Sequence, residues 1–179
     1  MPVPTLTTDR LVLRQIREDD AAALFPVLSD PKAMTWWSSG PHASLAETAD
    51  YVKGNAAEGQ GFHCWAITTG DDVALGWVIL IDGKPDVKEV GYILHRDYWG
   101  RGLAREAVSK VIDHGFRDLK LRRIFADTDP ENAGSIGLLE GLGFQREGHL
   151  RGEWETHIGI RDALIYGMLR DEWMMEKAQ

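Results

Sequence analysis

Cysteine is almost missing from this chain of 179 residues, in which Cys64 is the only one. A single thiol excludes an internal disulfide and a zinc site built on several cysteines. Cys64 lies within the apolar stretch F-H-C-W-A-I, so we expect it to be a core residue rather than a nucleophile. The sequence also lacks an apolar run of membrane-spanning length, and its N-terminus lacks a basic region followed by an apolar one. These absences predict a cytoplasmic protein with no membrane partner.

Positive charge is scarce as well, because 20 Lys and Arg stand against 28 Asp and Glu, a net charge of −8. This balance disfavours nucleic acid as a principal partner, whereas an acidic surface attracts a cationic amine. No internal repeat, low-complexity segment or linker interrupts the sequence. Its length and its 44% hydrophobic content suit one domain over residues 1–179.

Two common phosphate-binding patterns, G-x-x-x-x-G-K-[ST] and G-x-G-x-x-G, do not fit the mid-chain glycines Gly100 and Gly102. These lie in the turn W-G-R-G-L-A, between a short apolar strand and a segment with the apolar spacing of a helix. The first N–H groups of such a helix are unpaired and carry a positive partial charge, which suits a phosphate. Arg101 and Arg105 add cationic side chains there. The alternative is that the glycines only supply unusual backbone angles.

Strand and helix signals alternate around this turn and predict a mixed α/β domain. We expect strands over 11–16, 62–69, 73–81, 87–94, 121–127, 144–154 and 161–169. Helices are expected after Glu18-Asp19-Asp20 and before Pro31, from Ser44 through about Glu58, after Gly102, and over 132–140.

The turn at 99–104 resembles motif A of the GNAT superfamily of N-acetyltransferases, Q/R-x-x-G-x-G/A, which binds the pyrophosphate of acetyl-coenzyme A (acetyl-CoA). Trp99 departs from the first position and, within Y-W-G-x-G-x-A, looks like the RimJ/RimL branch of ribosomal-protein N-terminal acetyltransferases. The segment from Asn132 to Phe144 is similar to that branch's second block, N-x-x-S-I-x-L-L-E-x-L-G-F. The similarity extends from Thr8 to Trp173, so it covers nearly the whole chain.

This resemblance implies a single-domain GNAT fold, with a mixed, mostly antiparallel sheet of about seven strands flanked by helices. Its central strands, 87–94 and 121–127, would splay apart around the pantetheine arm of acetyl-CoA, and no metal would be needed. One backbone N–H near the thioester would stabilise the oxyanion formed by amine attack. The implied cofactor-binding residues are Tyr92, Ile93, Leu94, Trp99, Gly100, Arg101, Gly102, Leu103, Ala104, Arg105, Asn132 and Ser135.

Catalysis needs a base for the amine and a proton for the departing thiolate. We assign Glu89 as the base, acting directly or through water; Asp127 is the second candidate, and either carboxylate could instead be structural. Ser135 stands where the resemblance implies the acid, because Leu139 occupies the position of the tyrosine that many GNAT enzymes use. The alternative is an ordinary helix-start hydroxyl. His95 is expected to be structural.

The sequence leaves several classes of acceptor amine open. An α-amine of pKa near 8 is about one tenth neutral at pH 7, far more than a lysine amine, so a protein or peptide N-terminus is our first hypothesis. A small-molecule amine such as a polyamine, an amino acid or an aminoglycoside-like compound is the alternative, and a non-catalytic acyl-CoA sensor is a third reading. Trp36 and Trp37 either line the substrate cleft or pack on the sheet. Residues 173–175 serve a homodimer contact as easily as packing on their own domain.

Overall fold

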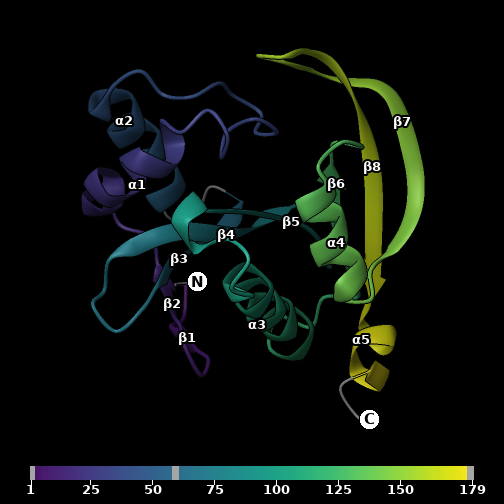
Figure 1. Ribbon diagram of the computed structural model, residues 1–179. Helices are drawn as coiled ribbons and strands as arrows, with labels where there is room; N and C mark the ends of the chain where they lie inside the picture. The colour runs from purple at the N-terminus through teal and green to yellow at the C-terminus, as the bar shows by residue number, and fades with distance from the viewer. Residues whose placement is uncertain (1–2, 58–60, 177–179) are drawn as a thin grey trace.

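An eight-stranded sheet runs through the residues that the computed structural model describes, 3–57 and 61–176 (Figure 1). The strands are β1 (Leu6–Thr7), β2 (Val12–Gln15), β3 (Phe62–Thr68), β4 (Ala74–Asp82), β5 (Val87–Leu94), β6 (Arg123–Thr128), β7 (Gln145–Thr156) and β8 (Gly159–Leu169). Their order is β1-β2-β3-β4-β5-β6-β8-β7. All seven expected strands are present; β1 escaped prediction because two residues carry no periodicity.

The central pair, β5 and β6, is parallel, while all the other neighbours are antiparallel. Its ladder begins at Val87 opposite Arg123 and ends at Glu89 opposite Phe125. Beyond that point β5 continues beside β4 as far as Leu94, and β6 continues beside β8 as far as Thr128. The two strands therefore separate after one short stretch of pairing, which confirms the expected splay.

Helices cover both faces of the sheet. On one face, α1 (Ala21–Leu28) and α2 (Leu45–Ala56) pack against β3, β4 and β5 through a cluster of buried side chains centred on Trp77. On the other face lie α3 (Leu103–Arg117) and α4 (Ala133–Gly141), whose apolar side chains join the larger core cluster. Two short 3-10 helices, η1 (Glu18–Asp20) and η2 (Arg96–Tyr98), and α5 (Arg170–Glu176) complete the fold. In Figure 1, α3 lies below β5 and α4 lies to its right.

The predicted helix ends are close to the observed ones. Ser44 caps α2 by accepting a hydrogen bond from the backbone N–H of Glu47 at 3.2 Å, as the capping-box spacing indicated. The helix ends at Ala56, and the predicted end at Glu58 lies outside the described residues. α1 contains Pro26 and ends at Leu28, before Pro31.

Buried residues settle two further expectations. Cys64 is 2% exposed, and burial raises the pKa of its thiol, which confirms a core residue. Trp173 is fully buried against Phe116 and donates its indole N–H to Asp113 at 3.1 Å, so this residue packs on its own domain, whereas Met175 is 69% exposed. Within 3–57 and 61–176, no helix has the length and apolar character needed to cross a bilayer.

Candidate active site

The mid-chain turn has the backbone conformation that its glycines predicted. Gly100 and Gly102 have φ of 71° and 76°, in the left-handed region that other residues rarely adopt. Gly102 is the N-cap of α3, and the first amide to bond back along the helix is that of Glu106, which donates to the Gly102 carbonyl at 3.0 Å. The three amides between them have no intrahelical acceptor and point out of the helix start, where they suit an anion.

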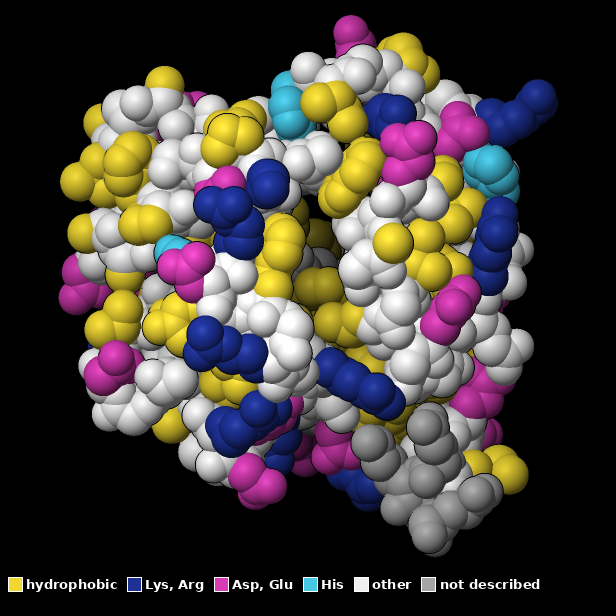
Figure 2. Space-filling model, in the orientation of Figure 1, with side chains coloured by type: hydrophobic (Ala, Val, Ile, Leu, Met, Phe, Trp, Pro, Cys, Tyr) yellow, Lys and Arg dark blue, Asp and Glu magenta, His cyan; other side chains and the backbone are white. Residues whose placement is uncertain are grey.

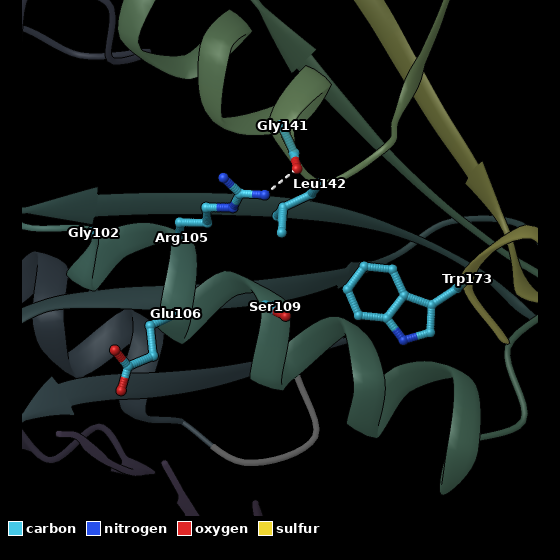
Figure 3. A pocket seen from close by; sticks show the side chains of 7 residues that line it. All are labelled: Gly102, Arg105, Glu106, Ser109, Gly141, Leu142 and Trp173. Carbon is cyan, nitrogen blue, oxygen red and sulfur yellow. Dashed lines mark hydrogen bonds between the residues drawn. The ribbon is translucent and has the colours of Figure 1, made fainter. Parts of the chain in front are cut away.

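Cationic side chains and a cavity adjoin this turn. Arg105 reaches from α3 across to α4 and donates to the carbonyl of Gly141, while the guanidinium of Arg101 lies 5.4 Å from the ring centre of Tyr98. Between the helices is a cavity of about 260 Å³ (Figure 3). It is lined by Gly102, Arg105, Glu106, Ser109, Gly141, Leu142 and Trp173. Unpaired amides, two arginines and a hollow beside them fit a diphosphate-bearing cofactor.

The N-terminal segment contacts this turn, although it is far away in the sequence. Glu106, in the first turn of α3, accepts hydrogen bonds from the hydroxyl of Thr8 at 2.5 Å and from Nε of Arg10 at 2.7 Å. Arg10 also donates to the carbonyl of Arg101 at 2.9 Å. The N-terminal segment thus neutralises the carboxylate nearest to the anion site and holds the turn. The T-D-R-L sequence carries no signal of a partner nearly a hundred residues away.

Trp99, the departure from the usual motif, has a structural explanation. Its indole N–H donates to the carbonyl of Leu94 at 2.8 Å, although half of the side chain is exposed. This bond ties the turn to the end of β5, where the strand has already separated from β6. The backbone from Tyr92 to Leu94 therefore lies beside the turn, as the predicted path of the pantetheine arm requires.

A hydroxyl pair lies on the α3–α4 side of the separated strands. Tyr92 Oη is 2.7 Å from Ser135 Oγ, in the first turn of α4, and burial raises the pKa of Tyr92 to about 12. Asn132 caps the same helix, because its side-chain oxygen accepts from the N–H of Ser135 at 3.1 Å. That cap leaves the amide N–H₂ of Asn132 as a donor. Leu139 is fully buried in the core. Sequence analysis named Tyr92 for its backbone and missed its hydroxyl.

Two carboxylates lie on the opposite face. Glu89 shares its face with Phe125, its register partner, and Asp127 follows two residues later on the same face of β6. Burial raises the pKa of both groups, and the charge of Asp127 raises the pKa of Glu89 further. The first and second candidate bases are therefore neighbours across the separating strands. His95 instead accepts a hydrogen bond from the N–H of Asp97 at 3.2 Å, as expected for a structural residue.

The two loop tryptophans have different surroundings. Trp37 packs edge-on against Trp77 and donates to the hydroxyl of Tyr51 at 3.0 Å, so it belongs to the core under α1 and α2. Trp36 is only half-buried, and the guanidinium of Arg161 on β8 lies 5.5 Å from its ring centre. Trp36 thus joins the loop between α1 and α2 to the far half of the sheet.

A hollow separates these halves on the face shown in Figure 2. It lies between the β5 side and the α4 side, hydrophobic side chains line its depth, and basic side chains gather on its rim. An apolar slot with a basic entrance matches a ligand that has a long neutral arm and an anionic end.

Comparison with known proteins identifies the family that has this geometry. The profile of the acetyltransferase (GNAT) domain matches residues 10–145, and the chain belongs to this family. An uncharacterized N-acetyltransferase, p20 of Bacillus licheniformis, is 36% identical over 174 residues, covering 94% of this chain and 98% of the relative. A [ribosomal protein uS5]-alanine N-acetyltransferase of Escherichia coli is 26% identical, covering 88% and 90%.

A solved structure supports the same fold. The spermidine N-acetyltransferase of Vibrio cholerae in complex with CoA and spermine superposes with a TM-score of 0.81 at 22% identity, covering 93% of this chain and 99% of that one. The family match makes the protein an acetyl-CoA-dependent N-acetyltransferase, which favours catalysis over the sensor reading. Within the described ranges, no group of three or more His, Cys, Asp or Glu side chains could hold a metal ion.

Proposed function

We propose that the acceptor is the N-terminal α-amine of a protein or peptide, as in the RimJ/RimL branch. The observation that carries this proposal is the pairing of the carboxylates on the acceptor side. Arg161 binds Asp129 through two hydrogen bonds, at 2.7 and 2.9 Å, and Glu131 through a third at 2.6 Å. Glu89 and Asp127 face each other across the separated strands, and the exposed Glu153 of β7 lies near Asp127.

This arrangement suits an acceptor with one ammonium group. A polyamine places a second and third cation a few methylene groups from the reacting amine, and each needs its own anion when it leaves water. Asp129 and Glu131 are already paired with Arg161, so a further cation would have to compete with this guanidinium for them. A peptide N-terminus needs only the Glu89–Asp127 pair.

The chemistry of this pair also matches an α-amine. Its ammonium form, of pKa near 8, binds at the two carboxylates, and Glu89 takes the proton directly or through water. Because its pKa is raised, Glu89 is a stronger base than an exposed glutamate. The difference between its pKa and the pKa of the amine is therefore smaller. The neutral amine nitrogen then forms a bond to the acetyl carbon as the bond from that carbon to sulfur breaks. The nitrogen releases its second proton to water, and water in turn restores the proton given to the departing thiolate.

The departing thiolate requires a proton, and the contact between Tyr92 and Ser135 supports this pair as its source. The two hydroxyl oxygens lie 2.7 Å apart, and we assign the tyrosine as the donor, which leaves the serine proton for the thiolate. Because burial raises its pKa, Tyr92 stays protonated at neutral pH. We propose Ser135 as the proton donor and Tyr92 as the residue that positions its hydroxyl.

The polyamine class remains a second candidate, because the fold is shared with a spermidine N-acetyltransferase. The test is free-thiol release from acetyl-CoA against peptides with ribosomal-protein N-termini, alongside polyamines, amino acids and aminoglycosides. Selective turnover of the peptides is the expected result. Turnover confined to a small amine would overturn the assignment of the acceptor while leaving the enzyme class intact.

A further inference from the structure

The β7–β8 hairpin contributes a side chain to the acceptor side that no motif singled out. Trp154 on β7 donates its indole N–H to Oδ2 of Asp127 at 2.7 Å, and half of its side chain is exposed. The indole N–H of Trp154 binds a half-buried carboxylate, while the rest of the ring is exposed to solvent. The side chain can therefore affect the acceptor in two ways. The edge orients the carboxylate, and the ring offers an apolar surface beside it.

The surroundings of Trp154 define the shape of this surface. Its register partner on β8 is Arg161, which lies over Trp36 from the loop between α1 and α2. Beneath them, Phe125 and Asp127 share one face of β6. Trp154 thus contacts Asp127 directly, and Trp36 adjoins it through Arg161, which is paired with its own carboxylates.

We infer that Trp154 determines which amines are accepted, by orienting Asp127 toward the ammonium and packing its exposed ring against the atoms next to the amine. In a peptide those atoms are the first side chain, so the preferred acceptors have an uncharged, apolar first residue. This inference rests on the proposed function for the peptide, although the same contact would select among simple alkylamines.

Two substitutions separate the two uses of Trp154. Trp154→Phe keeps a ring but removes the N–H, so turnover should fall about tenfold, the value of one hydrogen bond to a charged group. Preference among acceptors should remain. Trp154→Ala removes the ring as well, and the preference for an apolar over a polar first residue should fall about tenfold further, the discrimination expected of a methylene-sized contact. Ile160→Ala, on the same hairpin and 65% exposed, is the matched control and should change neither.

The pH profile adds a measurement that a merely structural role would not change. Three other carboxylates lie near Asp127. They are Glu89 on β5, Asp129 just after the end of β6, and Glu153 on β7. The indole N–H opposes these negative charges by stabilising ionised Asp127, so its loss raises the pKa of Asp127. Because the ammonium binds at both carboxylates, the acid limb of kcat/KM reports the ionisation of Asp127 as well as of Glu89. The Asp127 part of this limb should move to higher pH in Trp154→Phe and stay in place in Ile160→Ala.

The experiment measures kcat and KM for peptides that differ only in their first residue (Leu, Ala, Ser or Asp), and for butylamine against ethanolamine. A wild-type preference for the apolar member that disappears in Trp154→Ala supports the inference. A preference unchanged in Trp154→Ala, or an acid limb unmoved in Trp154→Phe, overturns it. If no peptide reacts but butylamine does, with the same loss of preference, the proposed peptide acceptor fails and the role of Trp154 stands.

Discussion

On the α3–α4 side of the sheet, the cofactor turn is made of backbone from one stretch of chain, residues 99–105, between a strand and the helix that follows it. On the α1–α2 side, the proposed acceptor site takes side chains from β5, β6, β7, β8 and a loop near residue 36. Acetyl-CoA is the same for every member of the family, and a local motif can bind it. An acceptor differs between enzymes, and the surface that selects it is assembled from separate loops and strands, where single substitutions are tolerated.

Because the cofactor turn is a local device, we expect a change within it to have the largest effect of all, and to lower the affinity for acetyl-CoA rather than the choice of acceptor. Gly102→Asp forces a side chain into left-handed backbone and sets a negative charge against the amides of α3. We expect the affinity for acetyl-CoA to fall about a thousandfold by calorimetry, because more than one charge-assisted hydrogen bond is lost.

Gly102→Ala is the control for this variant. It carries the same backbone cost without the charge, so the difference between the two variants isolates the electrostatic part. An affinity for acetyl-CoA that Gly102→Asp leaves intact would remove the assignment of the phosphate site.

The second prediction concerns the hydroxyl pair of Tyr92 and Ser135, on the α3–α4 side. Ser135→Ala should lower kcat about a hundredfold, within the range of general acid catalysis, with little change in acetyl-CoA affinity. Tyr92→Phe should lower kcat by less. Because Tyr92 acts through Ser135, the double variant should be no slower than Ser135→Ala alone. Additive losses would show that the two hydroxyls act independently, and an unchanged kcat in Ser135→Ala would leave it a helix-start residue.

The cofactor turn and the acceptor side also differ in how much of each could be predicted from the sequence. Gly100, Gly102 and the seven long strands were predictable because the signals are local: glycine where φ must be positive, and periodic apolar residues in strands and helices. The contact of Glu106 with Thr8, like that of Trp154 with Asp127, was not predictable. Such pairs depend on strand order and register, which periodicity within each segment does not determine.

The carboxylates provide the third prediction, which tests the acceptor side through pH. Glu89→Gln should lower kcat/KM about tenfold at neutral pH if water partly replaces the base. In the wild type, the acid limb should lie above the ordinary glutamate value of about 4.3, since burial and Asp127 raise the pKa of Glu89. Activity is then lost as the pH falls through this raised pKa. The limb should disappear or move in Glu89→Gln and persist in Glu155→Gln, an exposed carboxylate on the hairpin. An identical limb in both variants would transfer the role of base to Asp127.

The smallest effect is expected at Arg10, which tests whether the cofactor turn really is a local device. Arg10 reaches Glu106 and the carbonyl of Arg101 from the N-terminal segment, and half of its side chain is exposed. Its removal leaves Glu106 less compensated beside the anion site, so Arg10→Ala should weaken acetyl-CoA binding about threefold, the scale of an exposed ion pair. The matched control is Arg117→Ala, which breaks a similarly exposed pair with Asp113 near the other end of α3. A large loss from Arg10→Ala and none from Arg117→Ala would mean that the turn depends on a distant segment as much as the acceptor site does. Equal, small losses would mean that the glycines and amides of residues 99–105 suffice.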